Sequence, residues 1–296
     1  MTVIAAIPYK GGIVMVADSR ATIEGSGDTL LTEKLTKLSK GVISAQAGSS
    51  SLIELAKAVV QKYAGDLEQG KDVKDAIRKE LITLALKEGS TGHGDSIAEL
   101  LIAIKQDNGT IKLMSAGVFT GHAPYTDPSA APDADVGDIP HVYFNRVAYQ
   151  RPTAGGVDGS PQQVLNFIIE EHVADPSNMT EKEAEGAAYM LEHYYILHNA
   201  YVGGPIRMSV IDKEGIRDIS DDEMKQAAEE LKKAVQPQKE AGQNATPPLV
   251  PVKGANLLPV PVPEKPAPLI AIPKSESEMQ RSGHEAKRTR KSKSTG

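Results

Sequence analysis

A threonine, an aspartate and a lysine near the start of the chain could form a nucleophilic site. Thr2 follows Met1, Asp18 ends an apolar run, and Lys34 lies a little further along. If Met1 is removed, Thr2 carries a hydroxyl and a free α-amine, and an amine with a reference pKa of about 8 can accept the hydroxyl proton near neutral pH. A nearby lysine ammonium lowers the cost of forming the alkoxide, and a paired carboxylate keeps that ammonium charged. These residue types predict attack on a carbonyl carbon by the leading threonine.

Each of the three residues also fits a structural role. A β-branched threonine can open a strand, an aspartate can end one at a turn, and a lysine can be one of many solvated charges. The catalytic interpretation depends on the elements that would bring them together. Residues 2–8 and 13–17 are apolar and β-rich, and the segment between them supplies the two glycines of a hairpin turn. Antiparallel pairing would place Asp18 near the start of the first strand.

A second predicted strand pair leads to a glycine at a strand-to-helix junction. Residues 34–39 and 42–47 form that pair, and three serines after Gly48 offer capping hydroxyls to a helix. The expected buried face of this helix consists of Leu52, Leu55, Ala56 and Val59. Backbone amides at such a junction suit a developing negative charge, so the Gly48 N–H is a candidate oxyanion donor. Alternatively, the glycine only permits the turn.

The rest of the chain alternates between helical and strand patterns. The Asp107-Asn108-Gly109 turn predicts a hairpin between residues 97–104 and 110–114, and the composition of residues 117–137 is typical of a long loop. A short strand at 142–144 follows this loop. Thr180 begins a capping-box pattern. The expected helices span residues 73–86, 162–173, 180–197 and 221–235, and a last strand spans residues 206–211.

Composition separates a folded part from a tail. The chain has 296 residues and a net charge of −6, and residues 237–296 hold ten Lys/Arg against five Glu, which leaves −11 for residues 1–236. Ten of the nineteen prolines lie between positions 237 and 273, a composition typical of a disordered linker. We therefore predict one folded domain over residues 1–236 and a disordered Pro-rich tail over 237–296. The basic end of the tail, residues 287–293, is interpreted as a solubilising segment.

Several other classes of function are disfavoured. The absence of cysteine excludes disulfides and thiol nucleophiles, and no apolar run is long enough for a membrane span. The start lacks a secretory pattern, so we expect a cytoplasmic protein. His193 and His198 are five residues apart on one predicted helix, a spacing unsuited to sharing a metal ion. No metal, nucleotide or other cofactor is expected, and few aromatic residues make nucleic-acid binding an unfavoured alternative.

The N-terminal motifs resemble the proteasome β-subunit branch of the N-terminal nucleophile (Ntn) hydrolases. The resemblance covers about residues 2–220 and is carried, at the family's spacings, by Thr2, Asp18-Ser19-Arg20-Ala21-Thr22, Lys34-Leu35-Thr36-Lys37-Leu38 and Ala47-Gly48-Ser49. It implies an α+β fold, the four-layer αββα Ntn-hydrolase sandwich. It also implies Thr2 as nucleophile, Asp18 and Lys34 as its electrostatic support, and the Gly48 N–H as the oxyanion donor.

Three positions depart from the family pattern. Asp158 stands where the family has a catalytic serine, and either a catalytic role or a turn or N-cap role fits it. Asn199 and Val202 stand where the family has an aspartate and a serine. An asparagine offers only neutral hydrogen bonds, and a valine offers no hydroxyl. By family register, the substrate pocket would be lined by the small or polar residues Ala21, Thr32, Thr36, Gln46 and Ser50.

The resemblance implies a threonine endopeptidase that acts on peptides or unfolded proteins. Family members stack into rings that enclose their nucleophiles, so a homo-oligomeric ring is expected, and a ring ATPase is a further expected partner. Two alternatives stay open. The chain could be a weak or inactive scaffold subunit, altered at Asp158, Asn199 and Val202. It could also be a peptide ligase or transferase, in which an amine rather than water resolves the acyl-enzyme.

Overall fold

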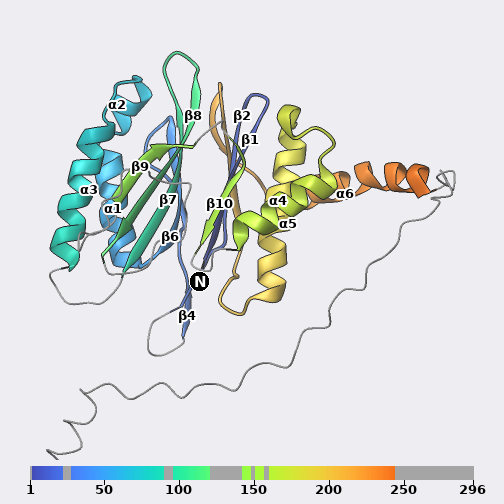
Figure 1. The fold of residues 1–296 in the computed structure, drawn as a ribbon, viewed down its shortest axis with the longest axis horizontal. Helices are drawn as coiled ribbons and strands as arrows, with labels where there is room; N and C mark the ends of the chain where they lie inside the picture. The colour runs from blue at the N-terminus through green and yellow to red at the C-terminus, as the bar shows by residue number, and fades with distance from the viewer. Residues whose placement is uncertain are drawn as a thin grey trace, which may run out of the picture. The chain divides into compact units, whose positions relative to one another are not determined.

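Two five-stranded sheets lie face to face, and helices cover the outer face of each (Figure 1). The structure is a computed structural model that describes residues 2–22, 28–89, 96–120, 142–147, 151–156 and 160–243, with residues 235–243 described by their backbone alone. Asp158 and the basic, Pro-rich tail lie outside these residues, apart from the start of the tail. The mixed arrangement of sheets and helices agrees with the α+β class expected from the sequence.

The first sheet carries the start of the chain on an inner strand. Its strand order is β10-β1-β2-β11-β12, and the predicted N-terminal hairpin is confirmed, with Ile4 opposite Ala17 and Tyr9 opposite Gly12. The hairpin consists of β1 (Val3–Tyr9) and β2 (Gly12–Ala17). It is flanked by β10 (Thr153–Gly156), β11 (Arg207–Asp212) and β12 (Gly215–Asp218). Asp18 therefore emerges beside the first residues of β1.

The second sheet contains the strands β5 to β9 in sequence order. These are β5 (Leu35–Lys37), β6 (Val42–Gly48), β7 (Ile97–Lys105), β8 (Ile111–Phe119) and β9 (Val142–Arg146). The hairpin predicted at Asp107-Asn108-Gly109 is confirmed by the β7–β8 pairing. However, β8 extends to Phe119. The start predicted for the long loop, residue 117, was therefore wrong. The ladder of β7 pairs continues through Gly117 and stabilises those residues as strand.

A small third sheet was not expected from the sequence. It pairs β3 (Arg20–Thr22) with β4 (Thr29–Leu31), directly after Asp18 and before Lys34. The amide of Thr32 also donates to the carbonyl of Ser19 at 2.8 Å. This ribbon returns the chain from the end of β2 towards the start of β5, which positions Lys34 close to Asp18.

Three helices cover the second sheet. They are α1 (Ser50–Lys62), α2 (Ala64–Glu68) and α3 (Lys74–Gly89), of which α2 was not predicted. The buried face expected for α1 was partly wrong, because Leu55 is 40% exposed whereas Ile53 and Val60 are buried. Both faces carry apolar residues at helical spacing, so the periodicity alone did not distinguish them. Packing against the sheet selects the face that contains Leu52, Ile53, Ala56 and Val60.

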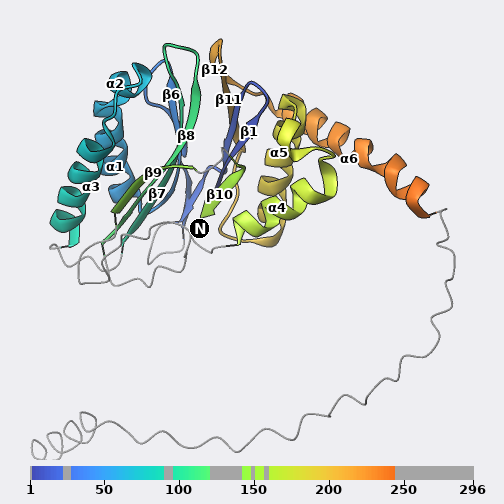
Figure 2. The same cartoon turned by 45° about the horizontal axis from the view of Figure 1, so that its top comes forward.

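Three further helices lie on the outer side of the first sheet, two of them against its strands and the last against the helix before it (Figures 1 and 2). They are α4 (Pro161–His172), α5 (Glu181–His198) and α6 (Asp221–Gln243), with a short 3-10 turn, η2 (Pro176–Asn178), before α5. The predicted capping box is confirmed, since Thr180 and Glu183 exchange hydrogen bonds at the start of α5. A proline usually ends a helix, which is why α6 was expected to stop at residue 235, but it continues through Pro237 to Gln243.

The core consists of three apolar layers. One lies between α1–α3 and the second sheet, one between the sheets, and one between the first sheet and α4–α6. Successive residues of β1 enter different layers, with Val3 facing the helices and Ile4 facing the other sheet. A strand buried on both faces needs a continuous apolar run, and full burial of each such aliphatic side chain contributes roughly 1.5–3 kcal/mol. No helix among the described residues has the length and apolar character to cross a membrane.

Candidate active site

Asp18 and Lys34 form a buried ion pair at the start of the first strand. Lys34 Nζ donates to Asp18 Oδ1 at 2.8 Å, and only 5% of Lys34 and 0% of Asp18 is exposed to solvent. The same ammonium donates to the carbonyl oxygen of Arg20. Asp18 Oδ1 also accepts the amide of Val3 at 3.3 Å. One carboxylate oxygen therefore joins the predicted lysine to the residue that follows Thr2.

The second oxygen of Asp18 connects two further segments. It accepts the amide of Arg20 at 3.1 Å and the amide of Gly203 at 3.2 Å. An ionised carboxylate has no donor of its own and can accept several hydrogen bonds, so Asp18 suits this position. The pairing of Asp18 thus ties together the first strand, the β3 ribbon, Lys34 and the loop between α5 and β11.

Burial shifts the pKa of Lys34. Removal from water lowers the pKa of Lys34, and the neighbouring Asp18 carboxylate raises it again in part. A desolvated lysine is closer to losing its proton than a solvated one, so its charge depends on its neighbours. This agrees with the role predicted for Asp18, which is to keep the ammonium charged.

Thr2 directly precedes β1 and is 8% exposed. Gly156, at the end of β10, has a φ of 153°, and a Cβ atom at this position would collide with the carbonyl oxygen of Thr2. The β10 strand therefore approaches the Thr2 main chain at a distance that requires glycine. Met1, whose removal would free the amine of Thr2, lies outside the described residues.

Gly48 occupies the predicted junction between β6 and α1. Its φ is 121°, and a Cβ atom there would collide with the carbonyl oxygen of Ile97. The next amide, that of Ser49, donates to the same Ile97 carbonyl at 2.7 Å, and α1 begins at Ser50. The position of Gly48 is as expected, whereas its role as an oxyanion donor stays a prediction.

The residues expected to line the substrate pocket differ in burial and in hydrogen bonding. Gln46 is almost fully buried, and its amide nitrogen donates to the Glu33 carbonyl at 3.1 Å and to Thr36 Oγ1 at 3.2 Å. The structure therefore brings Gln46 and Thr36 together. Ala21 and Thr32 are half-buried on and after the β3–β4 ribbon, and Ser50 is exposed at the start of α1.

The structure shows what Asn199 and Val202 do in the loop after α5. Asn199 Oδ1 accepts the amide of Tyr201 at 2.9 Å, which shapes the turn that follows the helix. Val202 is 1% exposed and belongs to the core layer beneath α4–α6. Both residues contribute to the loop that presents the Gly203 amide to Asp18. Asp158, the third departure, lies outside the described residues.

Two side chains at the site were not identified from the sequence. Arg20 Nη1 donates to the Ala200 carbonyl at 2.8 Å, and a Cβ atom on Gly203 would lie 2.6 Å from the Arg20 guanidinium carbon. Glu99 reaches from the second sheet and accepts the amide of Gly156 at 3.2 Å. Arg20 is quoted in the N-terminal motif, but only the fold brings it to residue 200. The signal for Glu99 is an acidic residue at an inward-facing position of β7, whose other residues before Lys105 are all apolar.

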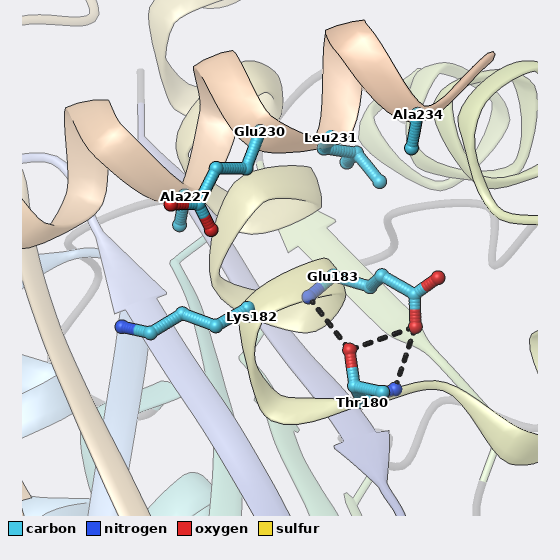
Figure 3. A pocket seen from close by; sticks show the side chains of 7 residues that line it. All are labelled: Thr180, Lys182, Glu183, Ala227, Glu230, Leu231 and Ala234. Atoms are coloured by element: carbon cyan, nitrogen blue, oxygen red, sulfur yellow. Dashed lines mark hydrogen bonds between the residues drawn. The ribbon is translucent and has the colours of Figure 1, made fainter. Parts of the chain in front are cut away.

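A pocket of about 230 Å³ lies elsewhere, between the start of α5 and α6 (Figure 3). Its lining includes Thr180 and Glu183, whose mutual hydrogen bonds already cap the helix. The 18-residue helix α5 is roughly 27 Å long, and the pocket lies at its first turns. The loop that contacts Asp18 follows the opposite end of the same helix. No group of three or more metal-binding side chains occurs among the described residues.

Comparison with known proteins identifies a distant relative. No model of a protein family matches the chain. Over 216 residues, 73% of this chain, it is 24% identical to a protein described as probable proteasome subunit beta type-1 from Schizosaccharomyces pombe, 81% of which is covered. The match agrees with the resemblance expressed by the N-terminal motifs. The chain is therefore similar, as a distant relative, to a β subunit of a proteasome.

Proposed function

We propose that this protein is a threonine endopeptidase whose nucleophile is Thr2, freed by removal of Met1. The observation that carries this proposal is the double use of Asp18 Oδ1, which accepts Lys34 Nζ at 2.8 Å and the Val3 amide at 3.3 Å. This arrangement links a buried ammonium, through one carboxylate oxygen, to the residue that follows Thr2. The similarity to a proteasome subunit supports peptide bonds as the substrate class.

The proposed reaction has two stages. Thr2 Oγ attacks the peptide carbonyl while the α-amine of Thr2 takes its proton, and the Gly48 N–H stabilises the resulting oxyanion. The intermediate collapses as the amine returns the proton to the departing nitrogen, which leaves an ester on Thr2. Water then attacks this ester with the same amine as base, and the acid product and the free hydroxyl are released. Lys34 stabilises the alkoxide electrostatically throughout.

The fold and the surface support the rest of the proposal. Helices on both outer faces of two facing sheets are consistent with the four-layer αββα sandwich of Ntn hydrolases. Large apolar side chains are exposed at Leu31 (68%), Phe167 (62%), Leu197 (65%) and Tyr201 (54%). Such surfaces suit coverage by neighbouring subunits, so we propose a homo-oligomeric ring that admits peptides or unfolded proteins, in the cytoplasm and with a ring ATPase as partner.

A covalent probe tests this function. An epoxyketone that reacts with a hydroxyl and an amine on one residue should add one inhibitor mass at Thr2 in the assembled protein. Intact mass before treatment shows whether Met1 is lost, and Thr2→Ala is the matched control that should gain no mass. A trimmed, assembled sample that forms no adduct would contradict the peptidase and support a scaffold subunit. Spliced product in the presence of a competing peptide amine would instead support a ligase.

A further inference from the structure

The helix α5 buries a second acidic side chain behind the Asp18–Lys34 pair. Glu192 is 0% exposed, and neither of its carboxyl oxygens has a hydrogen-bond partner among the described residues. Its helix packs against β1 and β2, the strands that begin directly after Thr2 and end directly before Asp18. Burial of a carboxyl group without a hydrogen-bond partner destabilises the folded protein. Its presence at this position therefore indicates a role other than stability. The proposed reaction as written above does not use Glu192.

A second buried glutamate on the same helix provides a comparison. Glu185 is also 0% exposed and lies two helical turns before Glu192 on the same face. Unlike Glu192, it is paired, because Lys182 Nζ donates to Oε2 at 2.7 Å and Arg217 Nη2 lies 3.5 Å from Oε1. Both residues are buried glutamates on α5, and they differ in the charged groups that they face.

The charges that face Glu192 are those of the candidate site. Burial and the Asp18 carboxylate raise the pKa of Glu192 well above its ordinary value, and the Lys34 ammonium lowers it in part. Within the described residues, α4, α6 and β1, which also pack against α5, add no charged group to this set. These effects favour the protonated form of Glu192. With Glu192 protonated, Glu192, Asp18 and Lys34 together carry one negative and one positive charge, and the nearby Arg20 guanidinium opposes the charge on Lys34.

We propose that Glu192 is a positioning residue that keeps the Lys34 ammonium charged at alkaline pH, an inference that rests on the proposed function. As the pH rises, the cluster of Asp18, Lys34 and Glu192 loses one proton to solvent. Glu192 can release this proton and become a carboxylate. An ionised Glu192 attracts the Lys34 ammonium and so retains the proton on Lys34. Without this carboxyl, the only proton left to lose is that of Lys34, whose pKa burial already lowers.

The pH dependence of the reaction tests this inference. The rate of epoxyketone inactivation should be measured from pH 6 to pH 10 for the assembled full-length protein, for Glu192→Gln and for Glu185→Gln. In Glu192→Gln, the fall of the inactivation rate at high pH should begin about half a pH unit lower than in the original protein. At a fixed pH within this alkaline limb of the profile, the rate should be about threefold lower. The rates at pH 7 should stay within about twofold, because the Asp18 carboxylate still supports the Lys34 ammonium in this variant. Glu185→Gln should keep the alkaline limb of the original protein.

Two outcomes would overturn the inference. Profiles of Glu192→Gln and the original protein that superimpose would show that Glu192 does not affect Lys34. An equal shift in Glu185→Gln would assign the effect to packing of α5 rather than to the charge cluster. If Glu192→Gln fails to fold, Glu192→Leu provides a neutral side chain suited to an apolar site and should show the same shift.

A second measurement separates this inference from the proposed function. If the original protein forms no adduct at any pH, the peptidase proposal fails, but thermal unfolding still reports the coupling between Glu192 and Lys34. The change in melting temperature caused by Glu192→Gln should be compared in the native background and in the neutral Asp18→Asn/Lys34→Met background. We expect the two changes to diverge at alkaline pH, because an ionised Glu192 is stabilised by the Lys34 ammonium only in the native background. Equal changes at every pH would contradict the coupling.

Discussion

Lys34 Nζ lies 2.8 Å from Asp18 Oδ1, and solvent scarcely reaches either group. In a buried pair each charge offsets the desolvation of the other, so removing one partner leaves the other unpaired. The pair also holds Val3, the neighbour of Thr2, through the shared oxygen Oδ1. Its integrity therefore affects both the stability of the fold and the position of the candidate nucleophile.

Lys34→Met should destabilise the protein more than the double change Asp18→Asn/Lys34→Met. The single variant leaves the Asp18 carboxylate buried without its cation, at a cost of about 3 to 5 kcal/mol, whereas the double variant removes both charges. Urea unfolding of the two variants measures the difference. Both should fail to form the epoxyketone adduct, since neither has the ammonium. Equal stability of the two variants would mean that the remaining carboxylate finds another partner.

Gly156→Ala should abolish adduct formation at Thr2, because the added methyl group would collide with the Thr2 carbonyl oxygen. Gly215→Ala is a matched control, since Gly215 has a similar φ of 135° but no atom within 4 Å of an added Cβ. Both changes should carry a backbone strain of about 1 to 2 kcal/mol, measured by urea unfolding. Only Gly156→Ala should also lose the adduct by mass spectrometry. A reactive Gly156→Ala protein would show that this close approach is not needed.

Arg20→Ala should slow inactivation by about tenfold, because Arg20 holds the loop whose Gly203 amide donates to Asp18. Arg20→Lys should not restore the rate, since lysine lacks the planar guanidinium that lies along Gly203. The inactivation rate constant at neutral pH is the measurement, and Arg78→Ala, an exposed arginine on α3, is the control. A normal rate in Arg20→Ala would show that the loop is held without this contact.

The stability of the protein should fall as pH rises from weakly acidic to neutral values, and Glu192→Gln should reduce that fall. The pKa of Glu192 is raised in the folded state, so above the ordinary glutamate pKa the unfolded chain releases a proton that the folded chain keeps. One such group lowers the free energy of unfolding by about 1.4 kcal/mol per pH unit until the folded-state pKa is reached. Lys34, whose pKa is lowered, contributes in the opposite direction at higher pH.

The measurement is the difference in melting temperature between Glu192→Gln and the original protein across this pH range. Taking the difference removes the contribution of groups that both proteins share. We expect the variant to be increasingly the more stable of the two as pH rises. Glu214→Gln, at an exposed glutamate in the β11–β12 turn, is the control and should leave the profile unchanged. A constant difference at all pH values would show that Glu192 is ionised in the folded protein.

Local patterns in the sequence determined the parts of the fold that depend on near neighbours. The N-terminal hairpin, the Asp107-Asn108-Gly109 turn and the Thr180 capping box each require only a few consecutive residues, and all three are present. The same is true of the Gly48 junction, where a strand pattern meets serine caps. The family resemblance also predicted Thr2, Asp18 and Lys34 as one group, of which the structure pairs Asp18 with Lys34 and bonds Asp18 to Val3, the neighbour of Thr2.

Tertiary structure alone decided the contacts between segments far apart in the chain. The Gly203 amide on Asp18, Glu99 on the Gly156 amide and the charges around Glu192 each join different elements, and no local periodicity encodes them. The exposed side of α1 was likewise chosen by the sheet it covers, because both of its faces satisfy the helical repeat. The sequence thus predicted which groups form the candidate site, whereas the packing of helices on two sheets determined which of them lie together and how strongly their protons are held.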